Sequence, residues 1–162
     1  METRKNIRLK EYDYSQNGVY FITICTKDKK MLFWNNNLNV GASIARPSDN
    51  YELSKIGIVA EDGIKNISEH YPVNVDSYVV MPNHIHLLLS ITNSGGRAML
   101  APTISHIIQQ YKGYVTKNIG FSPWQKLFYD HIVRDEQEYL NILNYIQTNP
   151  LKWHLDKYYI ED

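Results

Sequence analysis

Two histidines, His84 and His86, are separated by one residue within the run YVVMPNHIHLLL at 78–89. This run is typical of a β-strand, in which residues two apart point to the same face. The two imidazoles would then lie side by side, with Ile85 and Leu87 facing an apolar layer on the other side. Two imidazoles on a rigid strand could bind a divalent cation that takes its remaining ligands from oxygen atoms. The same spacing also fits two partly exposed strand histidines with no ligand.

A tyrosine and an asparagine, Tyr145 and Asn149, are spaced four residues apart further along the chain. They fall in a predicted helix and would therefore share one face of it. The tyrosine hydroxyl could attack an electrophile, and the amide oxygen could join a metal site. Ordinary alternatives are a packing role for Tyr145 and a helix-terminal role for Asn149 before Pro150. Together with the histidine pair, however, these residues indicate attack of a tyrosine on a phosphodiester beside a divalent cation.

The elements that must position these residues follow from turn residues and apolar periodicity. A strand is predicted at 19–26, and 31–34 could pair back as a short second strand. Ser54 opens a helix that ends at Tyr71-Pro72, and a hairpin follows at 73–81 and 84–92. Thr103 is a plausible N-cap for a second helix, 124–134 has an extended pattern, and a third helix begins near Asp135 and stops at Pro150. Strands that pair in hairpins favour an α+β fold, with helices packed on an antiparallel sheet.

The length and composition fit one soluble domain spanning 1–162. The chain weighs 19.0 kDa, and its 17 Lys and Arg balance 17 Asp and Glu, which excludes a uniformly basic surface. Cys25 is the single cysteine, so there is no internal disulfide. No apolar run approaches the ~20 residues of a membrane span, and the first residues lack the apolar core of a signal peptide. We therefore expect a cytoplasmic protein without a membrane partner.

The histidine run resembles the HUH motif (histidine, hydrophobic, histidine) of single-tyrosine transposases. Further segments resemble the same family in the same order: Trp124-Gln125, FYDHIVRD at 128–135, YIQTNP at 145–150, and Trp153. They are most similar to the REP-associated tyrosine transposase branch, and the resemblance covers roughly residues 15–158. It implies an antiparallel α+β sheet of the HUH endonuclease, ferredoxin-like type.

The resemblance also implies an activity. Such enzymes cleave and rejoin single-stranded DNA near hairpins with Mg²⁺ or Mn²⁺, through a 5′-phosphotyrosine and a free 3′-hydroxyl. Carried over, His84, His86 and Asn149 match the metal ligands, and Tyr145 matches the nucleophile. Related enzymes include homodimers with exchanged helices and forms that act as monomers, so both states stay open. Two other functions also stay open: a catalytically inactive or domesticated hairpin-DNA-binding module, and a metal-dependent phosphoesterase that uses water.

Contacts to DNA are predicted from cations near aromatic rings, which bind single strands by charge and stacking. The candidates in the basic N-terminal arm at 1–14 are Arg4, Lys5 and Arg8, with Lys10 nearby. Those in the second helix are Lys112, Tyr114 and Lys117, whereas Tyr111 belongs to the apolar stripe and is expected in the core. The segment 35–50 is expected to be a surface loop. His106, His131 and His154 lack a second ligand at metal spacing and are expected to be surface or hydrogen-bonded histidines.

Overall fold

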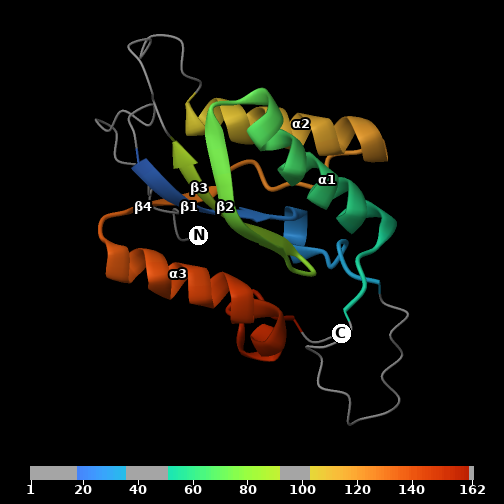
Figure 1. Cartoon of the computed structure of the whole chain (residues 1–162). Coiled ribbons are helices and arrows are strands. Elements are labelled where there is room, and N and C mark those ends of the chain that lie inside the picture. The colour runs from blue at the N-terminus through green and yellow to red at the C-terminus, as the bar shows by residue number, and fades with distance from the viewer. Residues whose placement is uncertain (1–17, 36–50, 92–102, 161–162) are drawn as a thin grey trace, which may run out of the picture.

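A computed structural model of the chain describes residues 18–35, 51–91 and 103–160. Four antiparallel strands form one sheet in the order β2-β3-β1-β4. The strands are β1 (Gly18–Cys25), β2 (Val73–Val80), β3 (His84–Ile91) and β4 (Tyr129–Val133). Helices α1 (Lys55–His70) and α2 (Ile104–Ile119) cover one face, and α3 (Glu136–Thr148) covers the other (Figure 1). The predicted α+β antiparallel fold is confirmed.

The helices begin where the sequence predicts them to begin. Ser54, Thr103 and Asp135 are the three N-caps, and each side chain accepts a hydrogen bond from a backbone N–H in the first turn of its helix. Such caps satisfy backbone donors that have no partner within the helix. Tyr71 is the C-cap of α1, and Gly120 is that of α2. The φ of 90° at Gly120 is the left-handed conformation that glycine adopts without strain. None of the helices in the described part of the chain is long and apolar enough to cross a membrane.

The central strand β3 contributes to an apolar cluster on each face of the sheet. Ile85, Leu87 and Leu89 point toward α1 and α2, where the larger cluster lies. Leu88 packs in a smaller cluster with Ile146 of α3. Because side chains alternate along a strand, His84 and His86 share the face of Leu88 and lie beneath α3. The fold thus brings the histidine pair and the helix that carries Tyr145 to one side of the sheet.

One prediction about the strands is wrong. Residues 31–34 do not form a strand in the sheet, because their only ladder contact is an isolated bridge between Trp34 and Leu53. The third helix ends before Pro150, as predicted, since α3 stops at Thr148 with Asn149 as its C-cap. Pro150 lies in the first turn of a 3₁₀ helix that follows, η2 (Asn149–Leu155), where its missing N–H leaves no hydrogen bond unmade. A second 3₁₀ turn, η1 (Lys27–Lys29), follows β1. The N-terminal arm and residues 36–50 of the predicted loop lie outside the described residues.

Gly57 on α1 is a position where the fold depends on the absence of a side chain. A Cβ there would overlap the backbone carbonyl of Phe33, which cannot move without disturbing the chain before the helix. We expect Gly57→Ala to lower the free energy of unfolding by about 2–3 kcal/mol. Gly113 on α2 is the matched control, since nothing lies within 4 Å of its added Cβ. Gly113→Ala should raise stability by about 0.5–1 kcal/mol in urea unfolding, and equal losses at both positions would contradict this account.

Candidate functional site

The two histidines of the HUH-like motif are fully enclosed, with exposed fractions of 0% for His84 and 1% for His86. Their strand β3 is paired on both sides, to β1 and to β2, which holds both backbones rigidly. The Nε2 atoms of the two rings lie 3.1 Å apart. One ion could therefore contact both nitrogens.

The other nitrogen of each ring is held by a neighbour. His84 Nδ1 lies 2.8 Å from Asn83 Oδ1, an acceptor, so this nitrogen carries the proton and Nε2 keeps its lone pair. His86 Nδ1 lies 2.8 Å from the hydroxyl of Thr23, its direct partner on β1. Such second contacts fix the ring orientation and tautomer of metal-binding histidines. The His84 ring is thus set to present an unprotonated Nε2, and the His86 ring is fixed with its Nε2 beside it.

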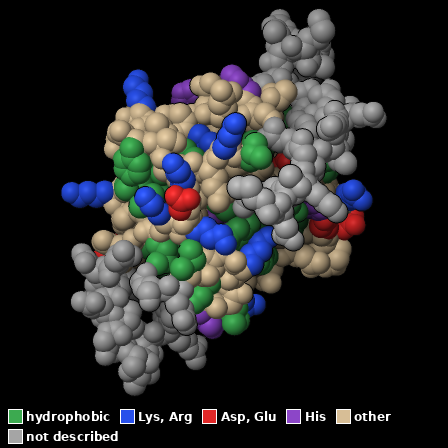
Figure 2. Space-filling view, turned by 180° about the vertical axis from the view of Figure 1, so that it is seen from behind, with side chains coloured by type: hydrophobic (Ala, Val, Ile, Leu, Met, Phe, Trp, Pro, Cys, Tyr) green, Lys and Arg blue, Asp and Glu red, His purple; other side chains and the backbone are tan. Residues whose placement is uncertain are grey.

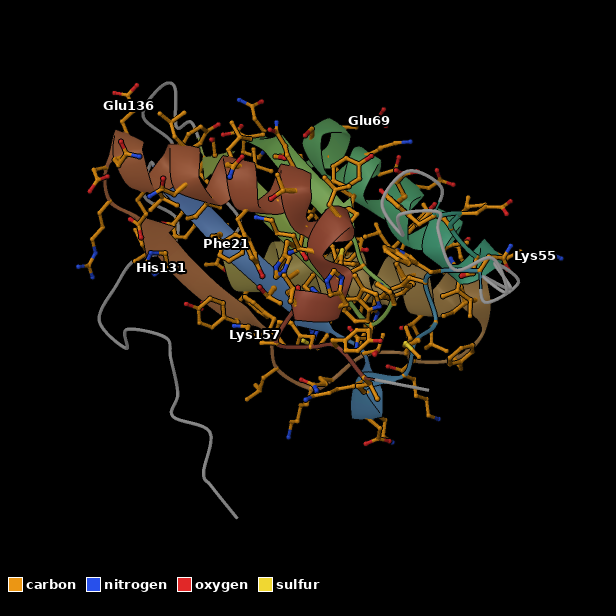
Figure 3. All side chains as sticks on the ribbon, turned by 90° about the horizontal axis from the view of Figure 1, so that it is seen from below. Phe21, Lys55, Glu69, His131, Glu136 and Lys157 are labelled. Carbon is orange, nitrogen blue, oxygen red and sulfur yellow. The ribbon has the colours of Figure 1, made fainter. Side chains whose placement is uncertain are left out.

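Tyr145 reaches the same point from α3. Its hydroxyl lies 3.5 Å from His86 Nε2, and the residue is 39% exposed. Phe21 of β1 stacks on the His86 ring and meets Tyr145 edge-on, which fixes the two groups relative to one another. Figure 3 shows Phe21 on this face of the sheet beneath α3. A partly exposed hydroxyl beside an enclosed imidazole is accessible to a substrate and also fixed in position.

Asn149 lies at the end of the same helix and is buried, with an exposed fraction of 2%. Its Nδ2 is enclosed and has no hydrogen-bond partner among the described residues. A buried amide N–H without an acceptor lowers the stability of the fold unless another group pairs with it. The helix therefore brings both predicted residues, Tyr145 and Asn149, to the side of the sheet that carries the histidines.

The structure adds a residue that the sequence analysis did not single out. After η2, the chain places Asp156 beside the histidines, with its carboxylate Oδ2 3.7 Å from His84 Nε2. One ligand atom from each of His84, His86 and Asp156 lies within 4.8 Å of the other two. Asp156 stands between Leu155 and Lys157 with no motif spacing, so no sequence pattern could have indicated it.

Burial dominates the electrostatics of the site. It lowers the pKa of His86 to about 3 and that of His84 well below its ordinary value, with a further contribution from the Lys157 cation. Burial also raises the pKa of Tyr145, and the Asp156 carboxylate adds to this, while Asn149 acts in the opposite direction. The pKa of Asp156 is raised by burial as well. Neutral imidazoles are the form that binds metals, whereas the phenol needs positive charge nearby to ionise.

These shifts predict that metal-free protein loses stability in mild acid. In the unfolded chain a histidine binds a proton below its ordinary pKa of ~6.5, whereas the folded state excludes it until about pH 3 at His86. Stability is therefore lost as the pH falls below ~6.5, by up to about 1.4 kcal/mol per pH unit for each histidine. Urea unfolding with a chelator at pH 7 and pH 5 measures the loss. Glutamine at both positions should flatten this slope, and an unchanged slope would contradict the assignment.

A cleft of about 340 Å³ opens beside Tyr145. Polar side chains of α3, two lysines from the following segment and the Asp156 carboxylate line it: Asn141, Asn144, Thr148, Lys152, Lys157 and Asp156. Lys157, labelled in Figure 3, lies with its Nζ 5.0 Å from the centre of the Tyr158 ring. Amides, hydroxyls and ammonium groups are the partners that phosphate and sugar oxygens require. The nucleophile candidate thus stands at the wall of a polar, cationic cleft.

The α2 residues predicted to contact DNA lie elsewhere. Lys112, Tyr114 and Lys117 belong to the helix layer on the face of the sheet opposite α3 (Figure 1). The ammonium group of Lys112 donates to the backbone carbonyl of Gln125, and Tyr114 is 37% exposed. The structure therefore does not bring them together with Tyr145. The arm residues Arg4, Lys5 and Arg8 fall outside the described residues.

The expectations for the other tyrosine and histidines are confirmed where the structure describes contacts. Tyr111 is buried in the core, and its hydroxyl donates to the backbone carbonyl of Ala60. His131 is bonded to Glu138, and His106 packs edge-on against Tyr71. Among the described residues, the group of side chains that could hold a metal ion includes neither His106 nor His131.

A second hollow, of about 930 Å³, lies where the turn after β1 meets the segment before β4. Three lysines line it, Lys27, Lys29 and Lys126, together with Trp124. Figure 2 shows lysine and arginine side chains gathered on one face of the molecule, with few carboxylates among them. The chain therefore has a local cationic surface, although its net charge is balanced.

No protein-family model matches the chain. An uncharacterized protein of Haemophilus influenzae is 36% identical, over 98% of this chain and 94% of its own length. A second protein of that organism, provisionally named a REP-associated tyrosine transposase, is 25% identical over 86% of this chain and 74% of its own. The solved structure of the REP-associated tyrosine transposase bound to a REP hairpin has a TM-score of 0.61, at 20% identity. It covers 92% of this chain and 77% of that one. This chain belongs to the REP-associated tyrosine transposase family.

Membership of the REP-associated tyrosine transposases agrees with the geometry described above. The family name refers to a tyrosine, and α3 supplies one whose hydroxyl lies beside the enclosed histidine pair. The shared fold extends over nearly all of the chain, so the sheet and the helices on both of its faces are common to the two structures. A transposase activity is thus the family-level function.

Proposed function

We propose that this protein is a metal-dependent endonuclease of the transposase type, which cleaves and rejoins single-stranded DNA near hairpins through a 5′-phosphotyrosine intermediate. The observation that carries the proposal is the position of the Tyr145 hydroxyl, 3.5 Å from His86 Nε2 at the wall of a cationic cleft. The hairpin partner is supported by the relative whose structure contains a REP hairpin.

A divalent cation fits the residues present. His84 and His86 offer neutral imidazole nitrogens, and the buried Asn149 adds an amide oxygen. Mg²⁺ or Mn²⁺ held there would supply positive charge that polarises a phosphodiester and favours the ionised phenol. In this proposal His84, His86 and Asn149 are the metal ligands.

Residues of the chain itself carry out the transfer of the phosphoryl group and the binding of DNA. Tyr145 Oη attacks phosphorus and forms the new P–O bond, while the bond from phosphorus to the 3′ oxygen breaks. The phenol loses its proton and the departing 3′ oxygen gains one, so the strand ends as a 3′-hydroxyl. Lys152 and Lys157 line the cleft and would bind the DNA backbone phosphates on either side of the one that is attacked. Attack of another 3′-hydroxyl on the phosphotyrosine rejoins DNA and restores the phenol.

A covalent-trapping assay tests the proposal. Purified protein is incubated with labelled single-stranded hairpin oligonucleotides and Mn²⁺ or Mg²⁺, then separated on a denaturing gel. We expect a protein band shifted by the mass of the cleaved fragment and lost on addition of chelator. Cleavage without an adduct would instead indicate a phosphoesterase that uses water. Binding without cleavage across a broad hairpin set would indicate a module that holds hairpin DNA.

A further inference from the structure

Asp156 has an unusual environment for a carboxylate. Its side chain is 1% exposed, and its Oδ2 is enclosed without a hydrogen-bond partner among the described residues. Its Oδ2 lies 3.7 Å from His84 Nε2, and the Asn149 side chain is close enough to lower the pKa of the carboxyl group. A buried carboxylate oxygen is unfavourable unless a proton or a cation is bound to it. Two imidazole nitrogens that face the same point make a cation the better explanation.

The segment that carries Asp156 is held in place by several contacts. Asn83 donates from Nδ2 to the backbone carbonyl of Tyr158 at 2.7 Å, and Asp156 Oδ1 accepts from the Tyr158 backbone N–H at 2.8 Å. The Tyr158 ring packs on His84, with ring centres 4.5 Å apart. Trp153 of η2 is buried beside the same histidine. The carboxylate is therefore preorganised, because the residue that fixes the His84 tautomer, Asn83, also anchors the segment.

We propose that Asp156 is a direct ligand of the divalent cation, so that a carboxylate joins the two histidines and Asn149 at the site. This inference rests on the metal dependence in the proposed function and adds a ligand from outside the HUH-like motif and the tyrosine helix. Two neutral imidazoles leave both charges of the ion uncompensated, whereas one carboxylate removes one of them. Its Oδ2 is the free oxygen, since Oδ1 already accepts the Tyr158 N–H.

Binding of Mn²⁺, followed by the loss of the free-ion signal in electron paramagnetic resonance, tests Asp156 without reference to activity. Asp156→Asn keeps an oxygen acceptor for the Tyr158 N–H and removes the charge. We expect the Kd for Mn²⁺ to rise at least ~10-fold, since even groups behind the ligands change affinity by ~10–100-fold. Glu136→Gln, which removes one exposed carboxylate from the first turn of α3, is the matched control and should leave the Kd unchanged.

The outcomes separate this inference from the function it rests on. In one outcome, Asp156→Asn binds Mn²⁺ with the same Kd as the unchanged protein, whereas His86→Ala loses Mn²⁺ binding. This result would overturn the role of Asp156 and leave metal-dependent cleavage standing. No Mn²⁺ binding by the unchanged protein would overturn both. Thermal melting of each metal-free variant reports whether it is folded. Should Asp156→Asn fail to fold, Asp156→Ser carries the same expected loss of affinity.

Discussion

Replacing Tyr145 with phenylalanine is expected to abolish the covalent protein–DNA adduct, with a loss of ~10³-fold or more in cleavage. The substitution removes the one atom that forms the bond to phosphorus and keeps the ring that meets Phe21 edge-on. Hairpin binding should stay within ~2-fold, since phosphate contacts carry most nucleic-acid affinity. The denaturing gel measures the adduct, and a native gel measures binding.

Tyr114→Phe is the matched control for this experiment. Tyr114 is exposed to nearly the same extent as Tyr145, 37% against 39%, and lies on α2 across the sheet. The same chemical change there should leave the adduct at its original level. An adduct that persists in Tyr145→Phe would assign the nucleophile to another tyrosine. Product that persists without any adduct would support water as the nucleophile.

Replacing His86 with alanine is also expected to lower the cleavage rate, by ~10²-fold or more, because the two enclosed imidazoles act as one unit. His86 is the residue in contact with both the Tyr145 hydroxyl and the His84 Nε2. The loss should not be rescued by raising Mn²⁺ or Mg²⁺ to the concentrations that saturate the unchanged protein. Rates measured across a metal titration give this result directly.

The control is a histidine that lies apart from this pair. His106 on α2 packs against Tyr71 and is exposed on the opposite side of the sheet, so His106→Ala removes an imidazole without touching the pair on β3. It should cleave at a rate close to that of the unchanged protein. Equal losses in the two variants would mean that general damage to the fold, and not the imidazole of His86, accounts for the effect.

Local chemistry explains which parts of the fold could be predicted from the sequence. Ser54, Thr103 and Asp135 were recognisable as N-caps because a cap depends on a hydroxyl or carboxylate and the N–H groups of the next turn. The alternation of His84, Ile85 and His86 indicated which side chains share a face, and the sheet register keeps that arrangement. Both signals involve neighbours within a few residues, so they can be recognised without knowledge of the tertiary structure.

The parts that could not be predicted depend on long-range packing. Pro150 follows the end of α3, as predicted, but the 3₁₀ helix η2 that comes next, with Trp153 buried in it, was not predicted. Asp156 is held at the site by contacts such as the one between the Tyr158 carbonyl and the Asn83 side chain, which joins residues 75 positions apart. The segment 31–34 had the composition of a strand, but it contributes Phe33 to the core below α1 and α2 instead of pairing in the sheet.

The central claim is that Tyr145 is the nucleophile, and mass spectrometry of the trapped adduct tests it most directly. The adduct is digested with nuclease and protease, and the peptide that carries the residual nucleotide is sequenced. We predict a 5′-linked nucleotide on Tyr145. The most informative alternative nucleophile is Tyr158, whose ring packs on His84. Burial and the neighbouring Cys25 thiol raise the pKa of its hydroxyl strongly. A nucleotide found on Tyr158, or on any tyrosine other than Tyr145, would contradict the account.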